Sequence, residues 1–212
     1  MSTAPAEPTA LAILKAAERL IADRGLDAVS LREISREAGA RNTNATQYHF
    51  GDRHGLLRAI VERHSTSIDI ERNHLLDHCE RGDGYTLDQL AHALVIPEAS
   101  KLVDADGGRD FLRIQGHLFA RPDFRPDPDR EPRSTSIQRW RRMAGPLLPV
   151  GAEKVHRRFS AITFMTVELA RRAERPTTRD HRLFVSNLVD LVAGILAADL
   201  SPATKRALKR RS

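Results

Sequence analysis

Residues 32–51 read REISREAGARNTNATQYHFG, and this stretch decides the fold. Ser30, just before it, is a good N-cap, and Glu33 three residues later completes a capping box that starts a short helix. Ile34 anchors that helix to a core, and Gly39 permits the sharp turn that ends it. A second short helical segment follows the turn. Two short helices joined by a tight turn are typical of a helix-turn-helix.

The second segment carries polar, mostly uncharged side chains of the kind that a recognition helix projects into the major groove. Amides and hydroxyls both donate and accept hydrogen bonds, which suits base edges and phosphate oxygens rather than bulk electrostatic attraction. We expect the amides of Asn44 and Gln47 to contact bases, and Thr43, Tyr48 and His49 to contact phosphates. The alternative interpretation is an ordinary helical corner with solvated polar residues.

The remainder of the chain also predicts helices. No run of alternating apolar and polar residues is bounded by hairpin signals, so strands are not expected. A first helix begins at Thr9 and stops at Gly25, and Asp52 starts a long helix. Further helical patterns cover about 87–103, 108–120, 152–173 and 179–200, whereas the four prolines of 121–133 predict a loop. The sequence therefore predicts an all-α fold.

Positive charge is concentrated at the carboxyl end. The formal net charge of the 212 residues is +6, and five basic residues fall in the last eight positions: Lys205, Arg206, Lys209, Arg210 and Arg211. Without them the chain is nearly neutral, so net charge alone does not indicate DNA binding. We interpret residues 201–212 as a solvated, frayed basic tail.

Other features argue against membrane, metal and catalytic roles. No uncharged stretch approaches the roughly 20 apolar residues of a membrane span, and residues 1–10 predict no signal peptide. Cys79 is the single cysteine, which suits a reducing compartment, so we expect a cytoplasmic protein. His74, His78 and Cys79 share a helix face but supply too few ligands for a metal. Catalytic and phosphate-binding motifs are missing, and the sequence predicts no cofactor and no enzyme.

The first third of the chain resembles the amino-terminal domain of TetR-type transcriptional regulators. The matching features, in order, are Thr9 at the start of the first helix, ILKAAERLIADRG, VSLREISREAGA, the YHF triplet and GDRHGLL. The resemblance implies a three-helix DNA-binding domain over residues 9–69, with the helix-turn-helix at about 32–51. It also implies a helical effector-binding and dimerisation domain over 70–200, whose last two long helices form a four-helix bundle across a homodimer.

The resemblance also bears on the DNA contacts. Arg53 stands where the family usually has a lysine, beside a helix start that Asp52 would cap, so we expect it to reach a phosphate. The recognition segment is one residue longer than the usual pattern, and Gln47 replaces an aromatic residue. The predicted DNA-binding residues are Thr9, Arg41, Asn42, Thr43, Asn44, Thr46, Gln47, Tyr48, His49 and Arg53.

Effector and dimer contacts are predicted from the later helices. His117 and Glu168 are polar residues within otherwise apolar patterns, and such residues often face a cavity. The predicted ligand-binding residues are His117, Trp140, Phe159, Met165 and Glu168, with core packing as the alternative. The last two long helices are apolar on more than one face, which favours a partner helix pair; a central helix of a monomer is the alternative.

We therefore predict a DNA-binding transcriptional regulator, a ligand-responsive repressor that acts as a homodimer on a near-palindromic operator. A small molecule bound in the helical body would change the separation of the two recognition helices, so that they no longer match one turn of DNA. One alternative is a regulator that senses a protein partner, or an activator, without a small-molecule effector. Another is a ligand carrier or enzyme with a vestigial DNA-binding element.

Overall fold

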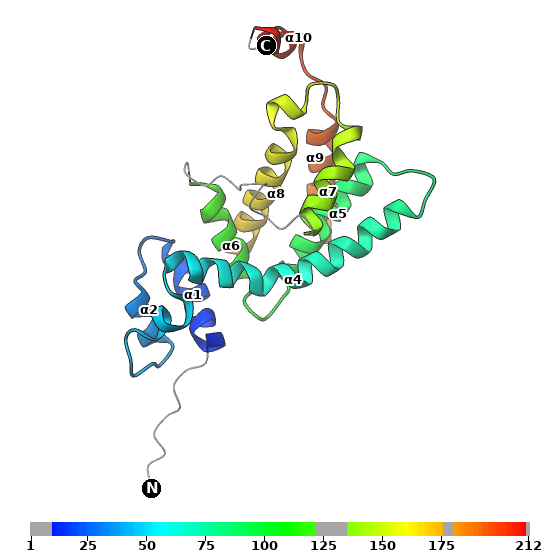
Figure 1. The fold of residues 1–212 in the computed structure, drawn as a ribbon. Helices are drawn as coiled ribbons and strands as arrows, with labels where there is room; N and C mark the ends of the chain where they lie inside the picture. Colours follow the sequence, from blue (N-terminus) through cyan, green and yellow to red (C-terminus); the bar gives the residue numbers. More distant parts are fainter. Residues whose placement is uncertain (1–9, 122–134, 176–179, 211–212) are drawn as a thin grey trace.

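A computed structural model describes residues 10–121, 135–175 and 180–210, and all regular secondary structure in these ranges is helical (Figure 1). The predicted all-α fold is confirmed. The α-helices are α1 (Ala10–Arg24), α2 (Leu31–Glu37), α3 (Ala45–Phe50), α4 (Arg53–Glu80), α5 (Leu87–Ala99), α6 (Gly108–Phe119), α7 (Ser136–Ala144), α8 (Arg157–Glu174), α9 (Arg182–Ala197) and α10 (Pro202–Lys209).

Helices α1 to α3 pack around a small apolar core at one end of the molecule. Ile13, Ile21 and Ile34 are fully buried there, and Leu56 closes the core from the first turn of α4. Leu11, at the start of α1, is 49% exposed and lies outside this core.

The 28-residue helix α4 connects this end to the larger helical body (Figure 1). Its buried side chains recur at every fourth position, which keeps them on one stripe of the helix. That stripe is Leu56, Ile60, His64, Ile68, Arg72 and Leu76. Arg72 is buried because its guanidinium donates to Ser136 Oγ on α7 at 3.0 Å and to Glu98 Oε1 on α5 at 3.1 Å.

The body consists of α5 to α9, with α6 packed on α8 and α5 packed on α9. Gly116 allows the first of these contacts to be close: a Cβ at that position would lie 2.4 Å from the Cβ of Ala170. Trp140 of α7 is fully buried, and its indole Nε1 donates to the Leu90 carbonyl at 2.7 Å. Buried indole donors normally find such an acceptor.

Several element boundaries differ from the predicted ones. Helix α7 was not predicted, and α10 is helical where we expected a frayed tail. Helix α8 begins at Arg157 rather than near 152, because His156 adopts φ 55° and separates it from a 3₁₀ turn. Thr9 and the proline-rich 122–133 lie outside the described residues. Among the residues described, no single helix is long and apolar enough to cross a membrane; only α9 with α10, across a 50° bend, passes that test.

Candidate nucleic-acid interface

The helix-turn-helix is held together by short-range polar contacts. Ser30 Oγ accepts from the Glu33 backbone N–H at 3.2 Å and caps α2 as predicted. The other half of the predicted capping box is replaced: the Glu33 carboxylate accepts from Arg24 at the end of α1, and Arg24 lowers the pKa of Glu33. Gly39 has φ 79°, a left-handed conformation that favours glycine and turns the chain after α2.

A buried hydroxyl pair fixes α3 against α2. Ser35 Oγ lies 2.8 Å from Thr46 Oγ1 and accepts from the Thr46 backbone N–H at 3.0 Å. Both side chains are fully buried. The prediction that Thr46 contacts DNA is therefore wrong, because its hydroxyl is used inside the protein. A six-residue helix with mostly polar residues gives no periodicity that distinguishes the buried hydroxyl from the exposed ones.

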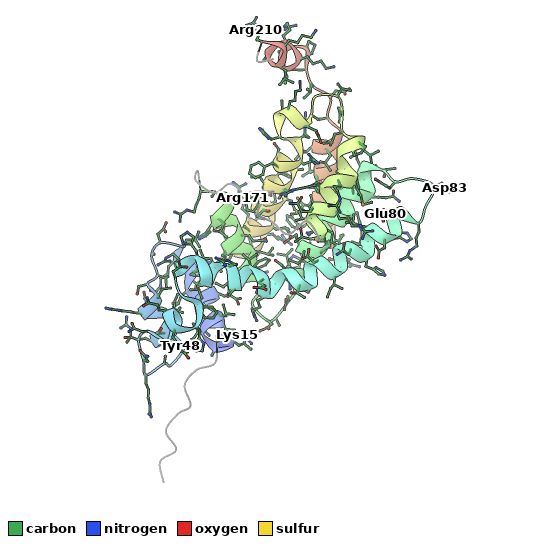
Figure 2. All side chains as sticks on the ribbon, viewed as in Figure 1. Lys15, Tyr48, Glu80, Asp83, Arg171 and Arg210 are labelled. Atoms are coloured by element: carbon green, nitrogen blue, oxygen red, sulfur yellow. The ribbon has the colours of Figure 1, made fainter. Side chains whose placement is uncertain are left out.

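The other predicted residues of the turn and of α3 lie on one exposed surface. Tyr48 is 85% exposed, and Figure 2 shows it at the outer side of the α1–α3 end. Its ring meets the His49 ring edge-on, with centroids 5.3 Å apart. Asn42 Oδ1 accepts from the Asn44 backbone N–H at 2.9 Å and shapes the entry into α3. The exposed residues that the structure brings together are Arg41, Asn42, Thr43, Asn44, Gln47, Tyr48 and His49.

The residues at the start of α4 have different roles. Asp52 caps the helix as predicted, accepting from the Gly55 N–H at 2.8 Å, and this bond lowers the pKa of Asp52. The Arg53 guanidinium donates to the carbonyls of Leu26 and Val29. It is therefore turned inward to close the loop between α1 and α2, which corrects the expectation of an outward phosphate contact.

An ionic network that sequence reasoning missed joins α1 to the body. The Glu18 carboxylate is 1% exposed and accepts from Arg63 Nη1 at 2.8 and 2.7 Å, and His64 Nε2 lies 3.2 Å away. Arg63 also pairs with Asp106 in the loop before α6, at 2.5 Å, and Lys15 pairs with Asp106 at 2.7 Å. The sequence signal for this network was Glu18, a charged residue directly after Ala16 and Ala17 in the first helix.

The five predicted ligand-binding residues do not meet in either of the two hollows described below. Trp140 and Met165 are core residues. Phe159 is 41% exposed and its ring stacks against Phe119 with centroids 6.2 Å apart. Glu168 pairs with Arg171 at 3.2 Å. Ligand binding at these five residues stays a prediction, and polarity within an apolar pattern does not distinguish a cavity wall from a surface.

Two hollows of the body are relevant to a ligand. His117 lines one of about 370 Å³ between α6, α8 and the loop that holds Leu26 and Asp27. A larger hollow of about 900 Å³ runs between α5 and α9 and includes His92 and His181 in its walls; we call it the α5–α9 groove. Within the described ranges, no three His, Cys, Asp or Glu side chains gather as metal ligands would.

Comparison with known proteins bears on the first quarter of the chain. Residues 13–60 match the family model described as "Bacterial regulatory proteins, tetR family". The matched segment runs from α1 into the second turn of α4 and contains the whole helix-turn-helix with its exposed polar surface. No curated protein matches the chain.

Proposed function

We propose that this chain is a DNA-binding transcriptional regulator of the tetR family, and that it is a homodimeric repressor controlled by a small molecule, because residues 13–60 match the model of that family. The proposal divides the chain into a DNA-binding domain over 9–69 and an effector-binding and dimerisation domain over 70–200. The basic segment 201–212 follows. The observation that carries the DNA-binding part is the exposed polar surface of α3.

We propose that α3 enters the major groove with Gln47 and Asn44 facing base edges. Amide side chains form paired hydrogen bonds with adenine, whereas a phenol or imidazole is suited to a phosphate oxygen. Tyr48 and His49 are therefore assigned to the DNA backbone, together with Thr43, Arg41 and Asn42. Thr46 and Arg53 keep structural roles, since their polar groups bond within the domain.

A homodimer is supported by the outer face of α9. Leu183 is 84% and Leu191 45% exposed, although both are large apolar side chains. Residues at three- or four-residue spacing lie on one helix face. The exposed residues on this face are Leu183, Asn187, Leu191 and Gly194. Gly194 has open space around the position of a Cβ and would allow a partner helix to approach closely.

Ligand control requires that the body and the DNA-binding domain move together or hold one another in place. The Glu18–Arg63–Asp106 contacts span α1, α4 and the loop before α6, and α6 also packs on α1. A rearrangement of α6 would therefore reach the DNA-binding domain through these ionic contacts, of which Glu18–Arg63 is buried. In a dimer, such a movement changes the distance between two recognition helices that must match successive major grooves.

The proposal is tested by selecting genomic DNA fragments with the purified full-length protein at near-physiological salt. We expect one or a few fragments that contain a near-palindrome with half-sites about one helical turn apart. Binding to these fragments should fall steeply as salt rises, because phosphate contacts release counterions. Recovery of unrelated fragments in proportion to their abundance would contradict specific operator binding.

A further inference from the structure

Two hydrogen-bond donors are buried without an acceptor where α6, α8 and α9 meet: Arg109 Nη1 and His181 Nε2. Arg109 lies in the first turn of α6, and its other terminal nitrogen donates to the carbonyls of Ala173, at 2.6 Å, and Arg175. These bonds fix the guanidinium and go to neutral oxygens. Buried donors in proteins normally have a partner, so a pair of unpaired ones calls for an acceptor from elsewhere.

The contacts of His181 determine which of its nitrogens donates. Arg172 Nε donates to His181 Nδ1 at 3.1 Å. A guanidinium N–H cannot accept, so Nδ1 carries the lone pair and the proton resides on Nε2. Burial, followed by the charges of Arg172 and Arg109, lowers the pKa of His181, whereas Asp180 opposes this shift. Near neutral pH, His181 is therefore an uncharged donor beside two guanidinium groups.

His181 is also a wall residue of the α5–α9 groove. Much of the wall is apolar, and Val185 and Val189 continue from His181 along the same helix. At the rim of the groove, Asp180 and Arg182 neutralise each other's charge. Arg182 Nε donates to Asp180 Oδ1 at 3.1 Å, and Arg182 Nη2 donates to Asp180 Oδ2 at 2.9 Å. Asp190, the other acid of the groove, lies nine residues beyond His181, about 13 Å along the helix axis. Among the lining residues, the His181 end of the groove therefore holds no unpaired acid that would repel a carboxylate.

We propose that the α5–α9 groove binds a small amphipathic carboxylic acid. The carboxylate accepts from His181 Nε2, the buried donor in the groove wall, and the apolar part lies along Val185 and Val189. The groove volume of about 900 Å³ falls within the range of small-molecule sites. This inference rests on the proposed ligand control. It assigns the effector to the α5–α9 groove instead of the five ligand-binding residues predicted from the sequence. It also gives a route to DNA, since His181 contacts Arg172 on α8, α8 packs on α6, and α6 packs on α1.

The test uses octanoate as the probe and octanamide as its uncharged match, each titrated calorimetrically into the full-length protein. We expect octanoate to bind about ten-fold more tightly than octanamide, because charged acceptors form the stronger hydrogen bonds. His181→Phe keeps a planar ring and removes the donor, so it should weaken octanoate binding about ten-fold. Octanamide binding should change by less than about two-fold. The matched control is His78→Phe on the exposed side of α4, which should leave both affinities unchanged.

A second measurement guards against variants that fold poorly. In the wild-type protein, the ¹⁵N and ¹H resonances of His181 Nε2–H should shift on addition of octanoate, and those of His78 should not. Equal affinities for octanoate and octanamide, or an unshifted His181 resonance at saturation, overturns the proposal.

Operator binding measured in the same buffer separates this inference from the proposed function. Absence of octanoate binding by a protein that still binds its operator overturns the carboxylate site and leaves the DNA-binding regulator intact. Octanoate binding at His181 with unchanged operator affinity supports the site and contradicts ligand control of DNA binding through it. Octanoate binding at His181 that releases the operator supports both.

Discussion

Ser35 Oγ on α2 and Thr46 Oγ1 on α3 lie 2.8 Å apart in the interior of the helix-turn-helix. The same Ser35 oxygen accepts from the Thr46 N–H and donates to the Leu31 carbonyl at 3.1 Å. One serine therefore satisfies groups of both helices and fixes the angle at which α3 presents its outer surface. Buried polar groups that are fully bonded in this way favour one arrangement over alternatives.

Ser35→Ala should destabilise the fold by about 1–3 kcal/mol, since it leaves the buried Thr46 N–H and hydroxyl without partners. Thr46→Val is nearly isosteric. It removes one hydroxyl but keeps the backbone N–H bond to Ser35 Oγ, so it should lower the free energy of unfolding by less than Ser35→Ala does. Urea unfolding followed by circular dichroism measures both. A larger loss of stability for Thr46→Val would contradict the assignment of Ser35 as the shared centre.

The Glu18–Arg63 contact should be important for stability because Glu18 is buried. Removing one member of a buried ion pair leaves an uncompensated charge and costs about 3–5 kcal/mol. We expect Arg63→Met to lower the free energy of unfolding by about that amount. The double variant Glu18→Leu, Arg63→Met should be more stable than Arg63→Met alone. The free energies of unfolding from a double-mutant cycle test this. Additive effects would contradict direct coupling.

Leu191→Glu should convert the proposed dimer to a monomer, because it places a charge at the centre of the exposed α9 face. Ile70→Glu is the matched control: Ile70 is 68% exposed on α4 and outside that face. Sedimentation velocity at micromolar concentration distinguishes the two species. A Leu191→Glu protein that sediments as the wild type does would exclude this face as the interface.

Cys79 should react slowly in the folded protein. Its side chain is 5% exposed, and burial raises the pKa of the thiol above the model-peptide value. The folded state therefore keeps a proton that the unfolded state loses, so stability falls as the pH rises through the unfolded thiol pKa of about 8.5. Iodoacetamide labelling at pH 8 should be slow without urea and fast with it. Equal rates would contradict a buried, protonated thiol.

The local signals of the sequence were sufficient for the fold of residues 10–60. Ser30, Gly39 and Asp52 stop and start helices through short-range capping, and each occupies its predicted place. The burial of Thr46 was not predictable, because it depends on Ser35 eleven residues earlier in the chain.

The body was predicted less accurately. Helix α7 is only nine residues long, and its buried Trp140, Met143 and Ala144 stand among three arginines directly after the proline-rich stretch, so the short pattern was overlooked. The predicted ligand-binding residues were hard to assign for a different reason: Trp140 and Met165 are large and apolar, and such residues fill a core as readily as a pocket. Arg109 and His181 are 72 positions apart in the sequence, and each contacts the end of α8 only in the folded chain.

The central claim is that the outer face of α3 contacts DNA, and it is tested most directly with the operator fragment recovered from the genomic selection. Fluorescence anisotropy should show that Gln47→Ala and Tyr48→Ala each weaken operator binding about ten-fold, equivalent to loss of one good contact. Both variants should retain the sedimentation behaviour of the wild type. Glu62→Ala, an exposed change on α4, serves as the control and should bind normally. Full-strength binding by both α3 variants would contradict the account.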